Sequence, residues 1–111
     1  MVESLANQIM EFMPIQNNWL PLESLIEQAF SSKNPSDYYV AIFNLFERFP
    51  EEDGSGVFWS AVHGMEKVGN YEKSLLHFYR RYPTLMTKIM LVRLQNSGHT
   101  MIEGMAINML I

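Results

Sequence analysis

The three histidines of the chain, His63, His77 and His99, are the residues best suited to metal binding or acid–base chemistry. Helical zinc sites usually place two histidines three or four residues apart with a carboxylate in reach, and these histidines are farther apart than that. Glu66 follows His63 by three residues, so one helical turn could join this pair. A single pair is not a site. The pattern favours His63 as an interior or boundary histidine bonded to backbone.

The segment EEDGSG at 51–56 combines acids and glycines, which suggests a calcium or phosphate loop. A calcium loop needs a glutamate at its twelfth position, and counting from Glu51 or from Asp53 finds none there. A phosphate loop needs a nearby lysine, but the next one is Lys67, and adjacent acids would repel an anion. We interpret the segment as a turn whose acids face outward, with Asp53 or Ser55 capping the following helix.

Other catalytic groups are also missing from the sequence. The chain has no cysteine, which excludes thiolate nucleophiles, disulfides and cysteine zinc sites. No serine stands in a G-x-S-x-G elbow. The sequence leaves open a catalytic pair of carboxylates, because Glu47 and Glu51 could be neighbours in the folded protein. We therefore predict a protein that is not an enzyme and has no metal or cofactor; an enzyme with a site around His63 and Glu66 is the least favoured alternative.

Apolar residues recur at helical spacing along most of the chain, which predicts a single all-α domain covering 1–111. We expect about seven helices, near 2–12, 21–30, 36–49, 55–69, 70–82, 83–97 and 100–109. Pro21 and Pro83 suit first helical turns, and Asn70 is expected to cap the fifth helix. The fourth helix is expected to bury Val57, Phe58, Ala61, Val62 and Met65.

The final helix has the clearest boundary signals. Gly98 can take the left-handed conformation that often ends a helix. Thr100 and Glu103 have the spacing of a capping box, in which the hydroxyl and the carboxylate each accept from a free backbone donor. The expected apolar face of this helix is Ile102, Met105, Ala106 and Met109.

A shift of 33 residues superimposes LFERFP on FYRRYP. The matched pairs are Tyr38 and Tyr71, Ile42 and Leu75, Leu45 and Phe78, Phe46 and Tyr79, Arg48 and Arg81, Phe49 and Tyr82, and Pro50 and Pro83. Apart from the arginines and prolines, these residues are expected to face the core. A period of this length is typical of stacked antiparallel helix pairs, so we predict a HEAT-like arrangement of three pairs and a terminal helix.

Charge is distributed unevenly. Residues 1–66 hold ten acidic and two basic residues, a net charge of −8, whereas residues 67–111 carry +4. Such asymmetry favours a charged partner surface, but the acidic half disfavours nucleic acid. The amino terminus lacks the positive segment of a secretory signal, and no apolar run is long enough to span a bilayer. We expect a cytoplasmic location without membrane contact.

The stretch ERFPEEDGSGVFWSAVHGMEKVGNYEKSLLHFYRRYPTLMTKIMLVRLQNSG, at 47–98, resembles the small helical immunity proteins encoded beside bacterial polymorphic and contact-dependent growth inhibition toxins. The resemblance implies a non-enzymatic protein that binds one cognate toxin domain and blocks its active site. Many such toxins are nucleases with positive clefts, which an acidic patch can occupy. The acids placed to do so are Glu47, Glu51, Glu52 and Asp53.

A second function remains open. Nine methionines are present, and several lie near the carboxyl end. Met101, Met105 and Met109 could line an adaptable groove, as methionine-rich binding surfaces do. The protein would then be a helical adaptor or secretion chaperone that holds an amphipathic segment of a partner. The sequence leaves the oligomeric state open.

Overall fold

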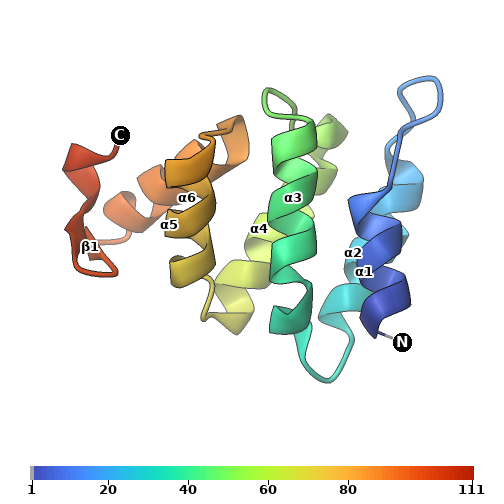
Figure 1. Ribbon diagram of the computed structural model, residues 1–111, viewed down its shortest axis with the longest axis horizontal. Coiled ribbons are helices and arrows are strands. Elements are labelled where there is room, and N and C mark those ends of the chain that lie inside the picture. Colours follow the sequence, from blue (N-terminus) through green and yellow to red (C-terminus); the bar gives the residue numbers. More distant parts are fainter. Residues whose placement is uncertain (1) are drawn as a thin grey trace.

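A computed structural model describes residues 2–111, with side chains from residue 4 onward. The protein is mostly helical (Figure 1). Its six α-helices in the described part are α1 (Val2–Met10), α2 (Leu20–Phe30), α3 (Tyr39–Arg48), α4 (Val57–Val68), α5 (Glu72–Arg81) and α6 (Leu85–Asn96). Short 3-10 turns are η1 (Pro35–Tyr38), η2 (Gly54–Gly56) and η3 (Ile107–Met109). Within residues 2–111, no helix has the length and apolarity needed to cross a membrane.

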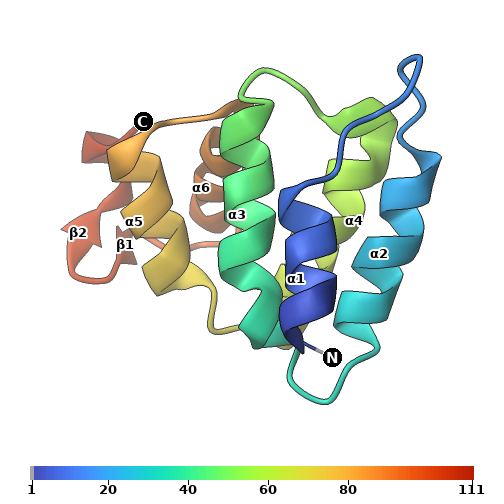
Figure 2. The ribbon, with the colours of Figure 1, turned by 45° about the vertical axis from the view of Figure 1, so that its right-hand side comes forward.

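The helices form two rows. Helix α3 packs between α1 and α5, and α4 packs between α2 and α6, while α1 with α2, α3 with α4 and α5 with α6 are also in contact. Figure 2 shows α1, α3 and α5 in front, with α4 and α6 behind them. The core lies between the rows and is rich in aromatic residues, including Phe43, Phe46 and Phe58, which are fully buried.

Local sequence accounts for these helices. Pro21 lies in the first turn of α2, and α3 ends at Arg48, two residues before Pro50. The predicted inward face of α4 is confirmed in full, since its five apolar residues are all buried. Gly64 lets α4 approach α2 closely, because a Cβ there would lie 2.7 Å from the Phe30 ring.

The 33-residue shift matches the helix bounds. Helices α3 and α5 each have ten residues, and they begin at Tyr39 and Glu72, which are 33 positions apart. Tyr38 and Tyr71, the matched residues, precede the two helices and are both buried. The two segments therefore hold equivalent positions in the same row.

The matched arginines also reach back along that row. Arg48 Nη2 donates to the Phe12 carbonyl oxygen at 2.7 Å, and Arg48 Nη1 donates to that of Met10, beside the end of α1. Arg81 Nη2 lies 3.4 Å from Glu47 Oε1, on α3. Each arginine thus joins the end of its helix to the preceding helix of the row.

The predicted helix at 100–109 is wrong. Strands β1 (Met101–Ile102) and β2 (Met105–Ala106) form a two-stranded antiparallel hairpin there, and η3 follows. Glu103 and Gly104 form its two-residue turn with φ values of 46° and 81°, the left-handed pair that tight hairpins require. A glycine in the first helical turn also weakens a helix. The hairpin buries Ile102 and is followed by the buried Ile107.

The capping box belongs to α6 instead. The Thr87 N–H donates to Thr84 Oγ1 at 3.2 Å, and the Thr84 N–H donates to Thr87 Oγ1 at 3.0 Å. The other predicted caps are wrong, because the residues before α4 and α5 are Gly56 and Tyr71 and neither helix has a side-chain cap. Ser55 and Asn70 have positive φ values of 53° and 59°, so they serve as turn residues.

Three connections lie along one edge of the molecule, the upper edge in Figure 1. They join α1 to α2, α3 to α4 and α5 to α6, and we call residues 11–19, 49–56 and 82–84 together the loop edge. A backbone hydrogen bond of 2.7 Å from the Leu85 N–H to the Pro50 carbonyl oxygen ties two of these connections. Trp19 ties the first connection to the second, since it packs against Phe49 and Phe58.

Candidate functional site

The acidic turn, Glu51, Glu52 and Asp53, lies in the middle of the loop edge, and all three side chains are exposed, as predicted. Among the described residues none of them forms an ion pair. The turn is held by its backbone, because the Glu52 N–H donates to the Phe49 carbonyl oxygen at 3.1 Å and the Phe58 N–H to that of Asp53 at 3.1 Å. The three charges are therefore free to meet a partner.

Glu47 does not belong to this exposed set. It lies on the last turn of α3 and faces α5, so its side chain is only 11% exposed and meets Arg81. Its Oε2 atom is buried and has no hydrogen-bond partner among the described residues. The expectation that Glu47 is presented with the acidic turn is corrected, because neighbouring helices cover it.

Exposed apolar residues, which we call the apolar patch, lie in the 11–19 connection and at the first residue of α2, and Trp19 ties this connection to the one that holds the acidic turn. Met13, Ile15 and Leu20 are 62%, 78% and 73% exposed, although large apolar side chains are usually buried. A tight turn at Gln16 and Asn17, both with positive φ, projects this segment outward. The sequence predicts only a connection between two helices here. The apolar residues in MPIQNNWL were the pattern that could have indicated the patch.

The methionines proposed as a groove are not gathered on one helical face. Met101 and Met109 are 50% and 82% exposed, and Met105 is half-buried with its sulfur 3.6 Å from Arg80 Nη1. A pocket of about 320 Å³ beside Met101 is lined by its hairpin and the end of α6, and not by Met105 or Met109. The hairpin thus separates residues that a helix would have aligned.

The histidine expectation is also corrected. His63 is exposed on α4 beside Trp59, with ring centroids 5.8 Å apart, and is not an interior residue. Glu66, its suggested partner, is bound to Arg93 instead. In the part of the chain that the structure describes, no three histidine or acidic residues are grouped so that they could hold a metal ion.

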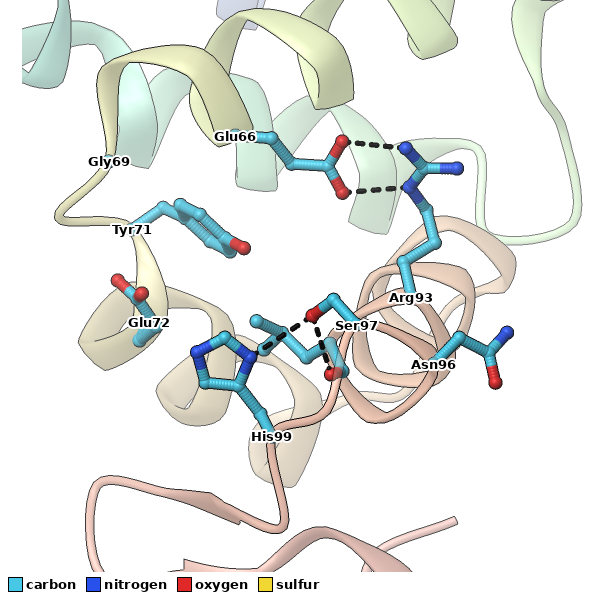
Figure 3. Close-up of a pocket in the computed structure, with 9 residues that line it drawn as sticks. Glu66, Gly69, Tyr71, Glu72, Arg93, Asn96, Ser97 and His99 are labelled. Carbon is cyan, nitrogen blue, oxygen red and sulfur yellow. Dashed lines mark hydrogen bonds and ion pairs between the residues drawn. The ribbon is translucent and has the colours of Figure 1, made fainter.

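An open pocket of about 560 Å³ lies where α4 ends, α5 begins and α6 ends (Figure 3). It is lined mostly by polar residues: Glu66, Gly69, Tyr71, Glu72, Arg93, Leu94, Asn96, Ser97 and His99. We call it the α4–α6 pocket. It lies at the opposite end of α4 from the loop edge.

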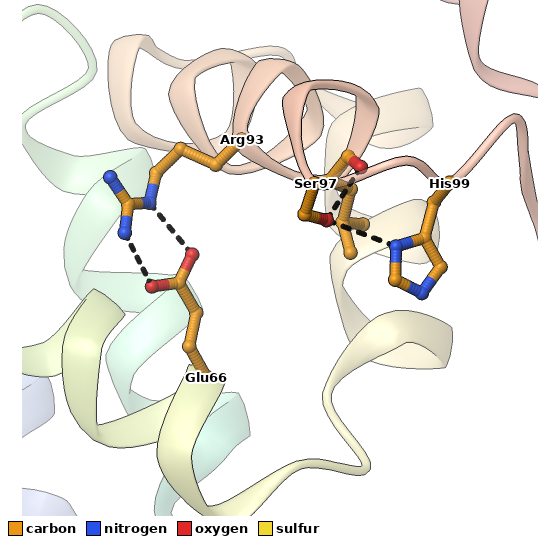
Figure 4. Close-up of polar contacts among 5 residues, drawn as sticks. Glu66, Arg93, Ser97 and His99 are labelled. Atoms are coloured by element: carbon orange, nitrogen blue, oxygen red, sulfur yellow. Dashed lines mark hydrogen bonds and ion pairs between the residues drawn. The ribbon is translucent and has the colours of Figure 1, made fainter.

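Glu66 and Arg93 form a two-pronged ion pair across this pocket (Figure 4). Arg93 Nε donates to Glu66 Oε2 at 2.7 Å and Arg93 Nη2 to Glu66 Oε1 at 2.8 Å, which raises the pKa of the guanidinium. The guanidinium also lies 5.5 Å from the Trp59 ring centroid, a favourable cation–π distance. These contacts fix Arg93 and satisfy its charge.

Tyr71 contributes a hydroxyl to the pocket. The residue is 5% exposed, and its hydroxyl points into the pocket, where no hydrogen bond joins it to the other residues drawn. Burial, and then the negative charges of Glu72 and Glu66, raise the pKa of this hydroxyl to about 12. It therefore stays protonated at neutral pH, able both to donate and to accept.

Two other hydroxyl groups at the pocket have partners. The Tyr39 hydroxyl donates to the Gly69 carbonyl oxygen at 2.7 Å. The Ser97 hydroxyl donates to the Leu94 carbonyl oxygen at 2.8 Å and lies 3.0 Å from His99 Nδ1. No sequence pattern indicates this site, because it is assembled from the ends of three helices.

No known protein family, curated protein or solved structure matches this chain in the comparisons made.

Proposed function

We propose that this protein is an immunity protein, which binds a cognate bacterial toxin domain in the cytoplasm and covers its active site. The observation that carries the proposal is the loop edge, where Glu51, Glu52 and Asp53 are exposed and form no ion pair with any described residue, and where the connection tied to theirs by Trp19 has exposed apolar side chains. Protein interfaces commonly combine an apolar centre with a charged rim. A partner that fits this edge has an apolar patch within a positive surface, and the cleft of a nuclease supplies the positive surface.

The order of the helices supports the same proposal. We infer that the three antiparallel helix pairs form a short HEAT-like stack, because α3 and α5 have matching bounds and matching arginine contacts. Stacks of helix pairs bring their connections to one edge, which provides an extended binding surface without catalytic residues. The loop edge would be that surface.

The experiment is to mix the purified protein with the toxin domain encoded immediately upstream of its gene and to measure the affinity by calorimetry at low and high salt. We expect tight binding that weakens as salt is added, because exposed charges are screened. The double variant Glu51→Gln with Glu52→Gln should bind more weakly and show a flatter salt dependence.

A matched control removes the same charge elsewhere. Glu27 and Asp37 are exposed acids outside the loop edge, and Glu27→Gln with Asp37→Asn should leave affinity close to wild type. Equal losses in the two double variants would show that net charge, not the loop edge, sets the affinity. A loss confined to serine substitutions at Met101 and Met109 would instead favour the adaptor or secretion chaperone.

A further inference from the structure

We infer that the α4–α6 pocket is a second binding site, which takes an organic cation: an ammonium or guanidinium group. This site lies away from the loop edge, so it does not depend on the toxin proposal. Three features lead to it: a hydroxyl that faces the pocket, a local excess of negative charge, and room for a group larger than a metal ion.

The first feature is the Tyr71 hydroxyl. A phenolic hydroxyl can donate one hydrogen bond and accept others. Tyr71 is more than nine-tenths buried, and its hydroxyl is the part that faces the open pocket, where no hydrogen bond joins it to another described residue. A bound N–H group would supply a partner, because the phenolic oxygen can accept from it.

The second feature is the charge around this hydroxyl. Glu66 and Glu72 contribute two negative charges and Arg93 one positive charge. Helices α4 and α6 end at the pocket with carbonyl groups that carry partial negative charge, whereas α5 begins there with partial positive charge, so two negative helix ends face one positive one. Burial is the largest cause of the raised pKa of Tyr71, and the negative charges of Glu72 and Glu66, which raise it further, outweigh the opposing effect of Arg93.

These same features disfavour an anion. Among the described residues that line the pocket, Arg93 is the one arginine or lysine, and it already gives two hydrogen bonds to Glu66. An anion would have to displace a carboxylate and approach Glu72 as well. A cation instead finds the Glu72 carboxylate, the Tyr71 oxygen and a volume of about 560 Å³.

The test is a titration of the isolated protein, followed by two-dimensional NMR of its backbone amides, with butylguanidinium and butylammonium as ligands. Neutral butyramide and anionic butyrate, of similar size, are the controls. We expect saturable shifts at Gly69, Tyr71 and Ser97 with the two cations and not with the controls. Ligands of so few atoms should bind with dissociation constants on the order of 1 mM.

Two variants test the residues. Glu72→Gln should weaken cation binding about tenfold, since it removes a charge-assisted hydrogen bond, whereas Glu103→Gln, which removes an exposed acid from the hairpin turn, should not. Tyr71→Phe should also weaken binding while leaving the unfolding midpoint unchanged or higher, because the lost hydroxyl has no partner in the free protein. A purely structural tyrosine would show the opposite pattern.

The inference is overturned if the cations give no saturable shifts, if butyramide gives the same shifts, or if Glu72→Gln and Tyr71→Phe both bind like wild type. A capped Gly-Lys-Gly tripeptide then identifies the source of the cation. Binding of the peptide as tightly as butylammonium would indicate a lysine side chain of a partner protein. Exclusion of the peptide, with butylammonium still bound, would indicate a free small amine.

Discussion

The ends of α3 and α5 share one sequence pattern but have different surroundings. Phe49, after α3, is half-buried because Trp19 packs across it with ring centroids 5.0 Å apart. Tyr82, the matched residue after α5, is 49% exposed, and its predicted inward orientation is wrong. The difference lies in the preceding connection of the loop edge. Residues 11–19 place the indole of Trp19 against the end of α3, whereas residues 49–56 place no aromatic side chain against the end of α5.

The same helix end is therefore covered or open, depending on whether the preceding connection places an aromatic side chain against it. The first end anchors the acidic turn, since Trp19 also packs against Phe58 at 5.4 Å, just after that turn. The second end leaves Tyr82 in an open pocket with Pro50 and Glu51. Four predictions test this difference, in order of decreasing expected effect.

Trp19→Ala should cause the largest loss, about 3–5 kcal/mol of unfolding free energy, because it leaves a cavity among Phe12, Phe49 and Phe58. Tyr82→Ala at the open end should cost less than about 1 kcal/mol. Denaturant unfolding followed by circular dichroism measures both. Similar losses at the two sites would mean that the ends are equally rigid.

Gly54→Ala should lower the unfolding free energy by about 2–4 kcal/mol. The backbone there has a φ of +61°, and a Cβ would lie 2.8 Å from Phe58 Cδ1 and 3.2 Å from Trp19 Cε3. Gly56→Ala is the matched control: its φ is +91° but nothing lies within 4 Å, so it should cost about 1–2 kcal/mol from backbone strain alone. Thermal melts of the two variants separate close packing from strain.

Arg48→Ala should cost about 1–3 kcal/mol, since it removes charged donors from the carbonyl oxygens of Met10 and Phe12. Arg81→Ala should cost about 1 kcal/mol or less, because its side chain is 59% exposed and its ion pair with Glu47 is long, at 3.4 Å. Chemical denaturation at low and high salt checks both values. A larger loss for Arg81→Ala would indicate that Glu47 depends strongly on its partner.

The starts of the two helices give the fourth prediction, which concerns alkaline pH. Tyr71 precedes α5, and its pKa is raised from 10.0 to about 12 in the folded protein. The unfolded chain therefore loses this proton first, so stability present below pH 10 should decline as pH rises towards 12. Tyr71→Phe should show a smaller decline in unfolding free energy over that range. An identical decline would exclude Tyr71 as its source.

Much of the helical framework could be predicted from periodicity and prolines. Six of the seven expected helices exist, and the face of α4 was predicted residue by residue. The caps were predicted poorly because Thr, Ser, Asn and Asp favour both caps and turns, and the choice depends on φ. No helix begins at Thr100 despite its capping pattern, because Glu103 and Gly104 form a turn that allows the hairpin to bury Ile102.

The candidate sites were likewise predicted only in part from the sequence. Exposure of Glu51, Glu52 and Asp53 followed from a charged turn between two apolar helices, whereas the cover over Glu47 required knowing that α5 packs against α3. Neither the apolar patch nor the α4–α6 pocket was predicted, because each depends on how separate segments meet.

The sequence by itself determined the helical class, most helix positions, the 33-residue correspondence of α3 with α5, and the acidic character of the first half. These depend on local spacing and composition, which act within a few turns of chain. Only the tertiary structure decided which matched side chain is covered, which acid is paired, and that Tyr71 faces a pocket made by three helices. Those outcomes depend on contacts between residues far apart in sequence, whose geometry no local pattern specifies.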